Sequence, residues 1–127
     1  MHVHVETPHS RCWSIPTYLS PEESAALLAN CRTLDLAHHP QGKVYGKPVT
    51  FHRDIGFFSD SSAGYAYSGQ LAQAQPMPLF LQEILAKVNE TCHTLFNGWL
   101  VNRYMSGAEY IGPIPMTNAD LVTVQWP

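Results

Sequence analysis

The segment that most constrains the fold is "FNGWLVNRYMSGAEYIGP", residues 96–113. Its aromatic and β-branched run "GWLVNRY" predicts a strand, "MSG" predicts a turn, and "AEYIG" begins another strand. Alternation along the first strand puts Asn102 and Tyr104 on one face and Arg103 on the other. An amide and a phenol that project together can hydrogen-bond a carboxylate ligand in a pocket, although a solvated polar face explains the same pattern.

Two helices are predicted before this strand. In "YLSPEESAALLANCRTL", Ser20 is a good N-cap, Pro21 fits the first helical position, and Glu23 completes a capping box. We expect this helix to span residues 21–34, with buried positions at Ala26, Leu27, Ala29, Cys31 and Leu34.

The second helix is predicted in "MPLFLQEILAKVNETCHTLF", where apolar residues recur with a helical period. Its apolar face consists of Leu81, Ile84, Leu85, Val88, Cys92 and Leu95. Two helices that precede a set of strands indicate an α+β domain.

Strand signals also lie outside the 96–113 segment. "HVHVE" at the N-terminus alternates like a short edge strand, on which His2 and His4 would share a face, either solvated or around a metal. Glycine and proline punctuate "GKVYGKPVTFHRDIGFFSD", which predicts a hairpin. "SSAGYAYSGQ" is predicted to be a small-residue loop, whose Tyr65 and Tyr67 either stack on bases or pin the loop by packing.

The composition indicates one folded domain. The chain has 127 residues, of which 45% are hydrophobic and 13% charged, and its net charge of −3 leaves only local contacts to nucleic acid. Three scattered cysteines favour a reducing compartment. With no secretion signal and no run of about 20 apolar residues, we expect a soluble, cytoplasmic protein.

"FHRDIGF" contains His52 and Asp54 at the spacing used by 2-His-1-carboxylate iron sites. Such matches arise often by chance, and the one later histidine at a suitable distance is His93. We interpret the His-x-Asp pair as coincidental and Arg53 as the informative residue.

These segments occur in the order of a known family. "VYGK", an arginine at Arg53, "GYAYSG", a helix and "FNGWLVNRYMSGAEYIGP" together resemble the AlkB-type Fe(II)- and 2-oxoglutarate-dependent dioxygenases, which demethylate alkylated bases. The resemblance covers residues 17–113, after a polar segment at residues 1–16. It implies N-terminal helices packed on an incomplete double-stranded β-helix (jelly-roll) core.

The resemblance also implies roles by position. The residues that correspond to the family's 2-oxoglutarate site are Leu100, Asn102 and Tyr104. The residues that correspond to its nucleotide-recognition hairpin and lid are Tyr45, Arg53, Tyr65, Tyr67 and Ser68. The implied cofactors are Fe(II) and 2-oxoglutarate. The implied partner is alkylated DNA or RNA, whose damaged base leaves the stack to be held near the iron; no membrane and no obligate protein partner are expected.

The resemblance ends before the iron ligands. Where the family has its metal-binding histidine and aspartate, this chain has Ile114 and Met116, which cannot bind iron. The codons "CAT TCC GAT GAC GAA CGC" encode His-Ser-Asp-Asp-Glu-Arg, the motif expected of the family. Read one base later they begin "ATT CCG ATG ACG AAC GC", which encodes Ile-Pro-Met-Thr-Asn-Ala, residues 114–119 of this chain.

We therefore hypothesise that a one-base frameshift produced a divergent tail at residues 114–127. The strand "WLVNRY" is then expected to lack partners and the product to be marginally stable. The leading expectation is an inactive AlkB-like oxidative dealkylase fragment. The alternatives are a non-catalytic nucleic-acid-binding module and a pseudogene product without function.

Overall fold

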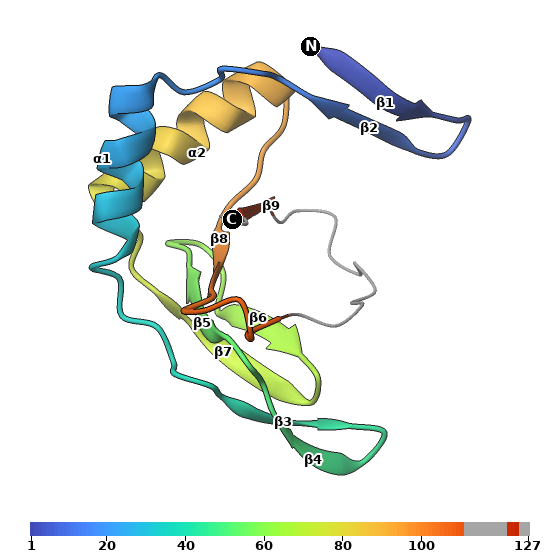
Figure 1. Cartoon of the computed structure of the whole chain (residues 1–127), viewed down its shortest axis with the longest axis vertical. Helices are drawn as coiled ribbons and strands as arrows, with labels where there is room; N and C mark the ends of the chain where they lie inside the picture. The colour runs from blue at the N-terminus through green and yellow to red at the C-terminus, as the bar shows by residue number, and fades with distance from the viewer. Residues whose placement is uncertain (111–121, 125–127) are drawn as a thin grey trace. The chain divides into compact units, whose positions relative to one another are not determined.

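The computed structural model describes residues 1–110 and 122–124 (Figure 1). The chain divides into two compact units, Met1–Thr33 and Leu34–Pro127. Helices and strands occur together, which agrees with the predicted α+β class. In the described part of the chain, neither helix has the length and hydrophobicity needed to span a bilayer.

The first unit contains a strand pair and one helix. Strand β1 (His2–Glu6) pairs antiparallel with β2 (Arg11–Ser14), which confirms the strand predicted for "HVHVE". Helix α1 spans Pro21–Cys31, and its capping box forms as predicted. The Glu23 backbone N–H donates to Ser20 Oγ at 3.1 Å, and the Ser20 N–H donates to Glu23 Oε1 at 3.1 Å.

The prediction of a buried face on α1 was wrong. The helix ends at Cys31, no residue of it is buried, and Leu34 is buried only as part of the chain that follows. A two-stranded sheet and an eleven-residue helix are too small to enclose an apolar helix face by themselves.

The second unit begins with the hairpin predicted around Gly46. Strands β3 (Gln41–Val44) and β4 (Lys47–Thr50) pair antiparallel through a two-residue turn. Tyr45 has φ 51° and Gly46 has φ 74°, so both turn residues are left-handed, as a type I′ turn requires.

A second hairpin stands where a loop was predicted. Strands β6 (Gly64–Tyr67) and β7 (Gln70–Gln75) pair antiparallel across Ser68 and Gly69, whose φ angles are 42° and 72°. The loop prediction was wrong because Tyr-Ala-Tyr alternation is a strand pattern and Ser-Gly supplies the left-handed turn. The Lys43 N–H donates to the Ser68 carbonyl at 3.0 Å, which joins this hairpin to β3.

The central sheet has the strand order β6-β7-β5-β8-β9. Strand β5 (Asp54–Phe58) is parallel to β7 and antiparallel to β8 (Trp99–Arg103). Strand β9 (Val122–Val124) pairs parallel with the other edge of β8. The expectation that "WLVNRY" lacks partners was therefore wrong. The strand expected in "AEYIG" is not formed at residues 108–110, and the rest of that segment lies outside the described residues.

The two faces of the sheet are covered differently. On one face, Ile55, Phe57, Tyr65 and Leu100 form a buried cluster, and three residues of the β6–β7 hairpin pack against it, namely Tyr67, Ala72 and Ala74. Alternation puts Trp99 on the opposite face, where its indole Nε1–H donates to the Leu81 carbonyl of α2 at 3.0 Å.

Helix α2 (Leu79–Cys92) presents Leu81 and Leu85 as its buried residues. Its predicted apolar face is correct up to Cys92, which is half-buried, but Leu95 is 94% exposed. The helix ends because His93 adopts a left-handed φ of 54°, so Leu95 leaves the helical face.

Candidate anion-binding site

The site is built where β5 and β8 pair. The register places Ile55 opposite Asn102, so these side chains share a face, and Arg53 lies on the same face two residues before Ile55. The Arg53 Nε–H donates to Asn102 Oδ1 at 3.0 Å. Arg53 is 5% exposed and Asn102 is 3% exposed, so a cation and an amide meet inside the protein.

Arg53 is a buried cation that lacks a counter-ion in the described ranges. Burial lowers the pKa of its guanidinium, and the phenols of Tyr104, Tyr67 and Tyr65 counter that effect. Its Cζ lies 4.9 Å from the centre of the Phe51 ring, which is close enough for a cation–π contact. No carboxylate pairs with Arg53 among residues 1–110 and 122–124. A desolvated guanidinium in this state attracts an anion.

Asn102 supplies a buried hydrogen-bond donor without a partner. The Arg53 Nε–H can only donate, so it fixes the amide oxygen toward Arg53 and turns Nδ2 away. Asn102 Nδ2 is buried and has no acceptor among the residues that the structure describes. Such a donor costs about 1–3 kcal/mol, so an acceptor from a ligand would remove a real penalty.

Tyr65 and Tyr67 lie beside the site. Their rings are stacked, with centroids 6.5 Å apart and an interplanar angle of 11°. Tyr65 is buried against Phe57 at 6.0 Å, and Tyr67 packs against Phe51 at 5.6 Å. Burial raises the pKa of the Tyr67 phenol, and Arg53 opposes that rise. Both side chains therefore combine ring packing with a polar hydroxyl group.

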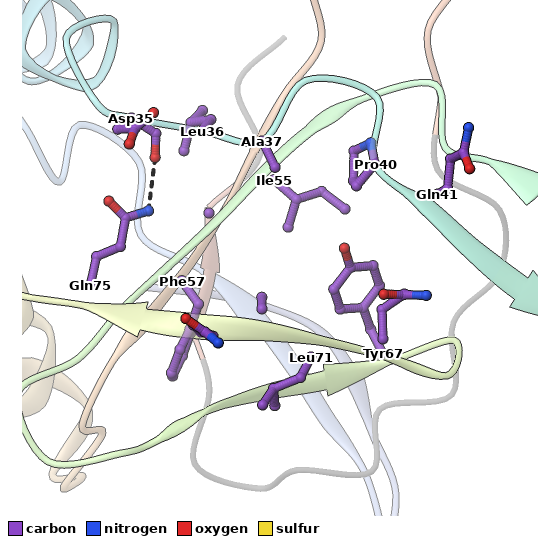
Figure 2. A pocket seen from close by; sticks show the side chains of 14 residues that line it. Asp35, Leu36, Ala37, Pro40, Gln41, Ile55, Phe57, Tyr67, Leu71 and Gln75 are labelled. Carbon is purple, nitrogen blue, oxygen red and sulfur yellow. Dashed lines mark hydrogen bonds between the residues drawn. The ribbon is translucent and has the colours of Figure 1, made fainter.

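A cavity of about 390 Å³ is lined in part by Tyr67 (Figure 2). It opens along one edge of β5, where Phe57 pairs with β7 while Ile55 forms an isolated bridge with Ala37. The Tyr67 ring points from β6 toward the segment that carries Ala37 and Pro40, and Gln75 Nε2 donates to the Asp35 carbonyl at 2.8 Å. Its lining has amide groups and the Asp35 side chain but no cation, and it includes neither Arg53 nor Asn102.

The structure brings together five of the residues chosen from the sequence, namely Arg53, Asn102, Tyr104, Tyr65 and Tyr67. Leu100 lies beside them in the core. Two others lie apart. Tyr45 is 99% exposed at the tip of the β3–β4 hairpin, and Ser68 occupies the β6–β7 turn. Positions 114 and 116 are outside the described residues.

Sequence reasoning missed a second polar cluster. Asp54 does not join His52 but forms a compact group with His38 and His39, which come before it in the chain. The later histidine considered as a partner for the His-x-Asp pair, His93, is instead the C-cap of α2. The signal that could have found the group is the adjacent pair "HH" at residues 38–39.

The cofactors implied by the family fit the residues unequally. A buried guanidinium beside an amide donor without a partner suits a carboxylate, so Arg53 and Asn102 are compatible with 2-oxoglutarate. The family's iron does not fit, because the isoleucine and methionine at positions 114 and 116 lack the imidazole and carboxylate ligands that it requires. Comparison of the chain with protein-family models gives no match, and comparison with curated proteins gives no significant one.

Proposed function

We propose that this chain is an AlkB-like domain that binds 2-oxoglutarate or a similar dicarboxylate between Arg53 and Asn102, without the oxidative dealkylation typical of the family. The observation that carries the proposal is the buried Asn102 Nδ2, which has no acceptor in the described part of the chain and sits beside an uncompensated buried cation. The resemblance of residues 17–113 supplies the choice of dicarboxylate and the incomplete jelly-roll as the expected fold.

Arg53 and Asn102 can account for binding of a dicarboxylate, but this chain has no residues for the iron-dependent demethylation of the family. A ligand carboxylate would accept from Asn102 Nδ2 and pair with the Arg53 guanidinium, in a desolvated setting that strengthens both interactions. In the family, bound iron activates O₂ to hydroxylate an N-alkyl group on a base. Because Ile114 and Met116 cannot hold that iron, we expect no 2-oxoglutarate-dependent demethylation of alkylated DNA or RNA.

The sharpest test is Asn102→Asp. This change preserves shape and the acceptor for Arg53 Nε, but it replaces the free donor by a negative oxygen. Titration calorimetry with 2-oxoglutarate should show binding by the unmodified chain and at least about a hundredfold weaker binding by the variant, since a hydrogen bond to a charged group is lost and repulsion is added. Thermal stability should hold or rise, because Arg53 gains a counter-ion.

The matched control is Asn30→Asp, an exposed position in α1. It introduces the same charge far in sequence from Arg53 and should leave the affinity unchanged. Equal affinity in the unmodified chain and Asn102→Asp, or no binding by the unmodified chain, would contradict the proposed site.

A second candidate, a non-catalytic nucleic-acid-binding module, is favoured by the β3–β4 hairpin tip. Tyr45 is 99% exposed there, and Lys43 and Lys47 flank it in the sequence. An aromatic ring between two cations can stack on a base while the lysines contact phosphates. Single-stranded oligonucleotide binding should then weaken steeply with salt and fall severalfold in Tyr45→Ala, with Asn102→Asp leaving it unaffected. Salt-independent binding would exclude this candidate.

The frameshift hypothesis has its own test. Genomic DNA across codons 105–127 should encode His-Ser-Asp-Asp-Glu in an alternative frame from codon 114. If so, restoring that frame should also restore iron-dependent turnover. If no alternative frame continues the family pattern, the frameshift hypothesis is wrong, and a binding function is favoured over a frameshifted dioxygenase.

A further inference from the structure

The His38–His39 pair is placed by a backbone bridge. The Ala37 N–H donates to the Ile55 carbonyl at 2.8 Å, and the Ile55 N–H donates back at 3.0 Å. This bridge fixes the next two residues beside Asp54, which precedes Ile55 on β5. Asp54 is 1% exposed, so its carboxylate forms the buried floor of the group.

The three side chains converge at the spacing of a metal site. One ligand atom from each of His38, His39 and Asp54 lies within 4.8 Å of the other two. Asp54 Oδ1 lies 2.7 Å from His38 Nδ1 and accepts from the His39 N–H at 3.4 Å. Tetrahedral zinc with ligand distances of about 2.0–2.1 Å separates its ligand atoms by about 3.4 Å, so small side-chain movements would admit the ion.

The backbone is strained to bring both rings to this place. His39 has φ 40°, a left-handed conformation that is uncommon outside glycine, although asparagine, aspartate and histidine adopt it more often than other residues. In an extended chain, neighbouring side chains point in opposite directions. Here the two imidazoles instead stack with centroids 4.1 Å apart and an interplanar angle of 17°. Strain of this kind is typical of functional positions.

Two further residues orient the group. Arg103 Nη2 and Nε each lie 2.9 Å from Asp54 Oδ2, so Arg103 occupies one carboxylate oxygen and leaves Oδ1 to the histidines. Glu109 Oε1 contacts His39 Nε2, and the Glu109 side chain is only 9% exposed. Zinc-binding histidines and carboxylates ordinarily have such hydrogen-bonded partners behind them.

We propose that His38, His39 and Asp54 form a site for a divalent metal ion of the zinc class, oriented by Glu109 and Arg103. Imidazole and carboxylate ligands suit Zn²⁺. Asp54 and Arg103 lie on the sheet face opposite Arg53 and Asn102, so this site is independent of the proposed dicarboxylate function. The ion would tie the segment after Ala37 to β5, which would stabilise the second unit.

The test uses Co²⁺ and Zn²⁺ on the full chain carrying His2→Gln, His4→Gln and His9→Gln, which removes adventitious N-terminal ligands. The decisive variant is His39→Asn, because asparagine tolerates a left-handed φ. Its matched control is His93→Asn, at the other left-handed histidine (φ 54°). His38→Gln is a second variant, at a side chain that is 71% exposed, in which the glutamine amide can still donate to Asp54.

We expect one Co²⁺ per chain with visible ligand-field absorption, and a rise in Tm with Zn²⁺. His39→Asn and His38→Gln should each weaken binding at least about tenfold, whereas His93→Asn should bind like the parent. The proposal is overturned if the parent does not bind at about 1 mM Co²⁺. It is equally overturned if both site variants bind as tightly as the parent.

Discussion

Arg53 and Asp54 are adjacent buried charges that enter opposite faces of the sheet and are stabilised in different ways. Burial acts to raise the pKa of the Asp54 carboxyl, but the hydrogen bonds and charges of Arg103 and His38 together keep that pKa below its ordinary value. Arg53 receives the Asn102 amide oxygen and lies over the Phe51 ring, but no carboxylate among the described residues pairs with it. Asp54 therefore has charged partners among the described residues, whereas Arg53 has no anionic one there.

The Asp54–Arg103 pair should matter for stability. Arg103→Gln would leave Asp54 as a buried charge without its cation, so we expect urea denaturation to show a free energy of unfolding lower by about 3 kcal/mol. The control is Arg11→Gln, since Arg11 pairs with Glu6 at 3.8 Å with both side chains largely exposed, and its loss should cost less than about 0.5 kcal/mol. Similar losses in the two variants would contradict a special role for the buried pair.

At the scale of elements, local signals predicted the helices and the first hairpin. The capping box at Ser20 and the glycines and proline of "GKVYGKP" are both short-range signals, and the expected helix and hairpin both form. The β6–β7 hairpin was missed because serine before glycine is a weaker turn signal than the prolines and glycines around β4. The pairing of β8 with β9 was missed because it joins residues about twenty positions apart, beyond any local pattern.

The start of β8 depends on a close backbone approach at Gly98. A Cβ at this position would lie 2.9 Å from the Phe58 carbonyl oxygen and 3.0 Å from the Phe57 ring. Because the first contact is backbone, Gly98→Ala should lower the free energy of unfolding by about 1–3 kcal/mol, measured by thermal denaturation. Gly107→Ala is the control, since nothing lies within 4 Å of its Cβ, and it should be nearly neutral. A neutral Gly98→Ala would argue against the β5–β8 packing.

At the scale of the whole molecule, we expect local stability against unfolding to differ between strands. Every residue of β5 is buried, as are four of the five residues of β8, whereas β1 is exposed along its whole length. Amide hydrogen exchange should therefore be slowest in β5 and β8 and orders of magnitude faster in the β1–β2 pair. Uniform protection across the chain would show that the first unit is stabilised by more than its own strand pair.

The α+β class follows from periodicity, but the functional sites depend on contacts between distant segments. Asn102 and Tyr104 could be assigned to one face from alternation alone. Arg53 meets Asn102, 49 residues away in the sequence, because of the β5–β8 register. His38 meets Asp54 because Ala37 and Ile55 form a β-bridge. The adjacent histidines at residues 38–39 suggest a pair of ligands in the local sequence, but neither they nor Arg53 reveal which distant residue they meet.

The most direct test of the central claim is the response of the Asn102 side-chain amide to 2-oxoglutarate in ¹⁵N-resolved NMR. If Nδ2 donates to a bound carboxylate, its two proton resonances should shift downfield with saturation, while those of Asn30, exposed in α1, stay in place. If the Asn102 resonances are unchanged at saturating 2-oxoglutarate, the Arg53–Asn102 pair is not a dicarboxylate site.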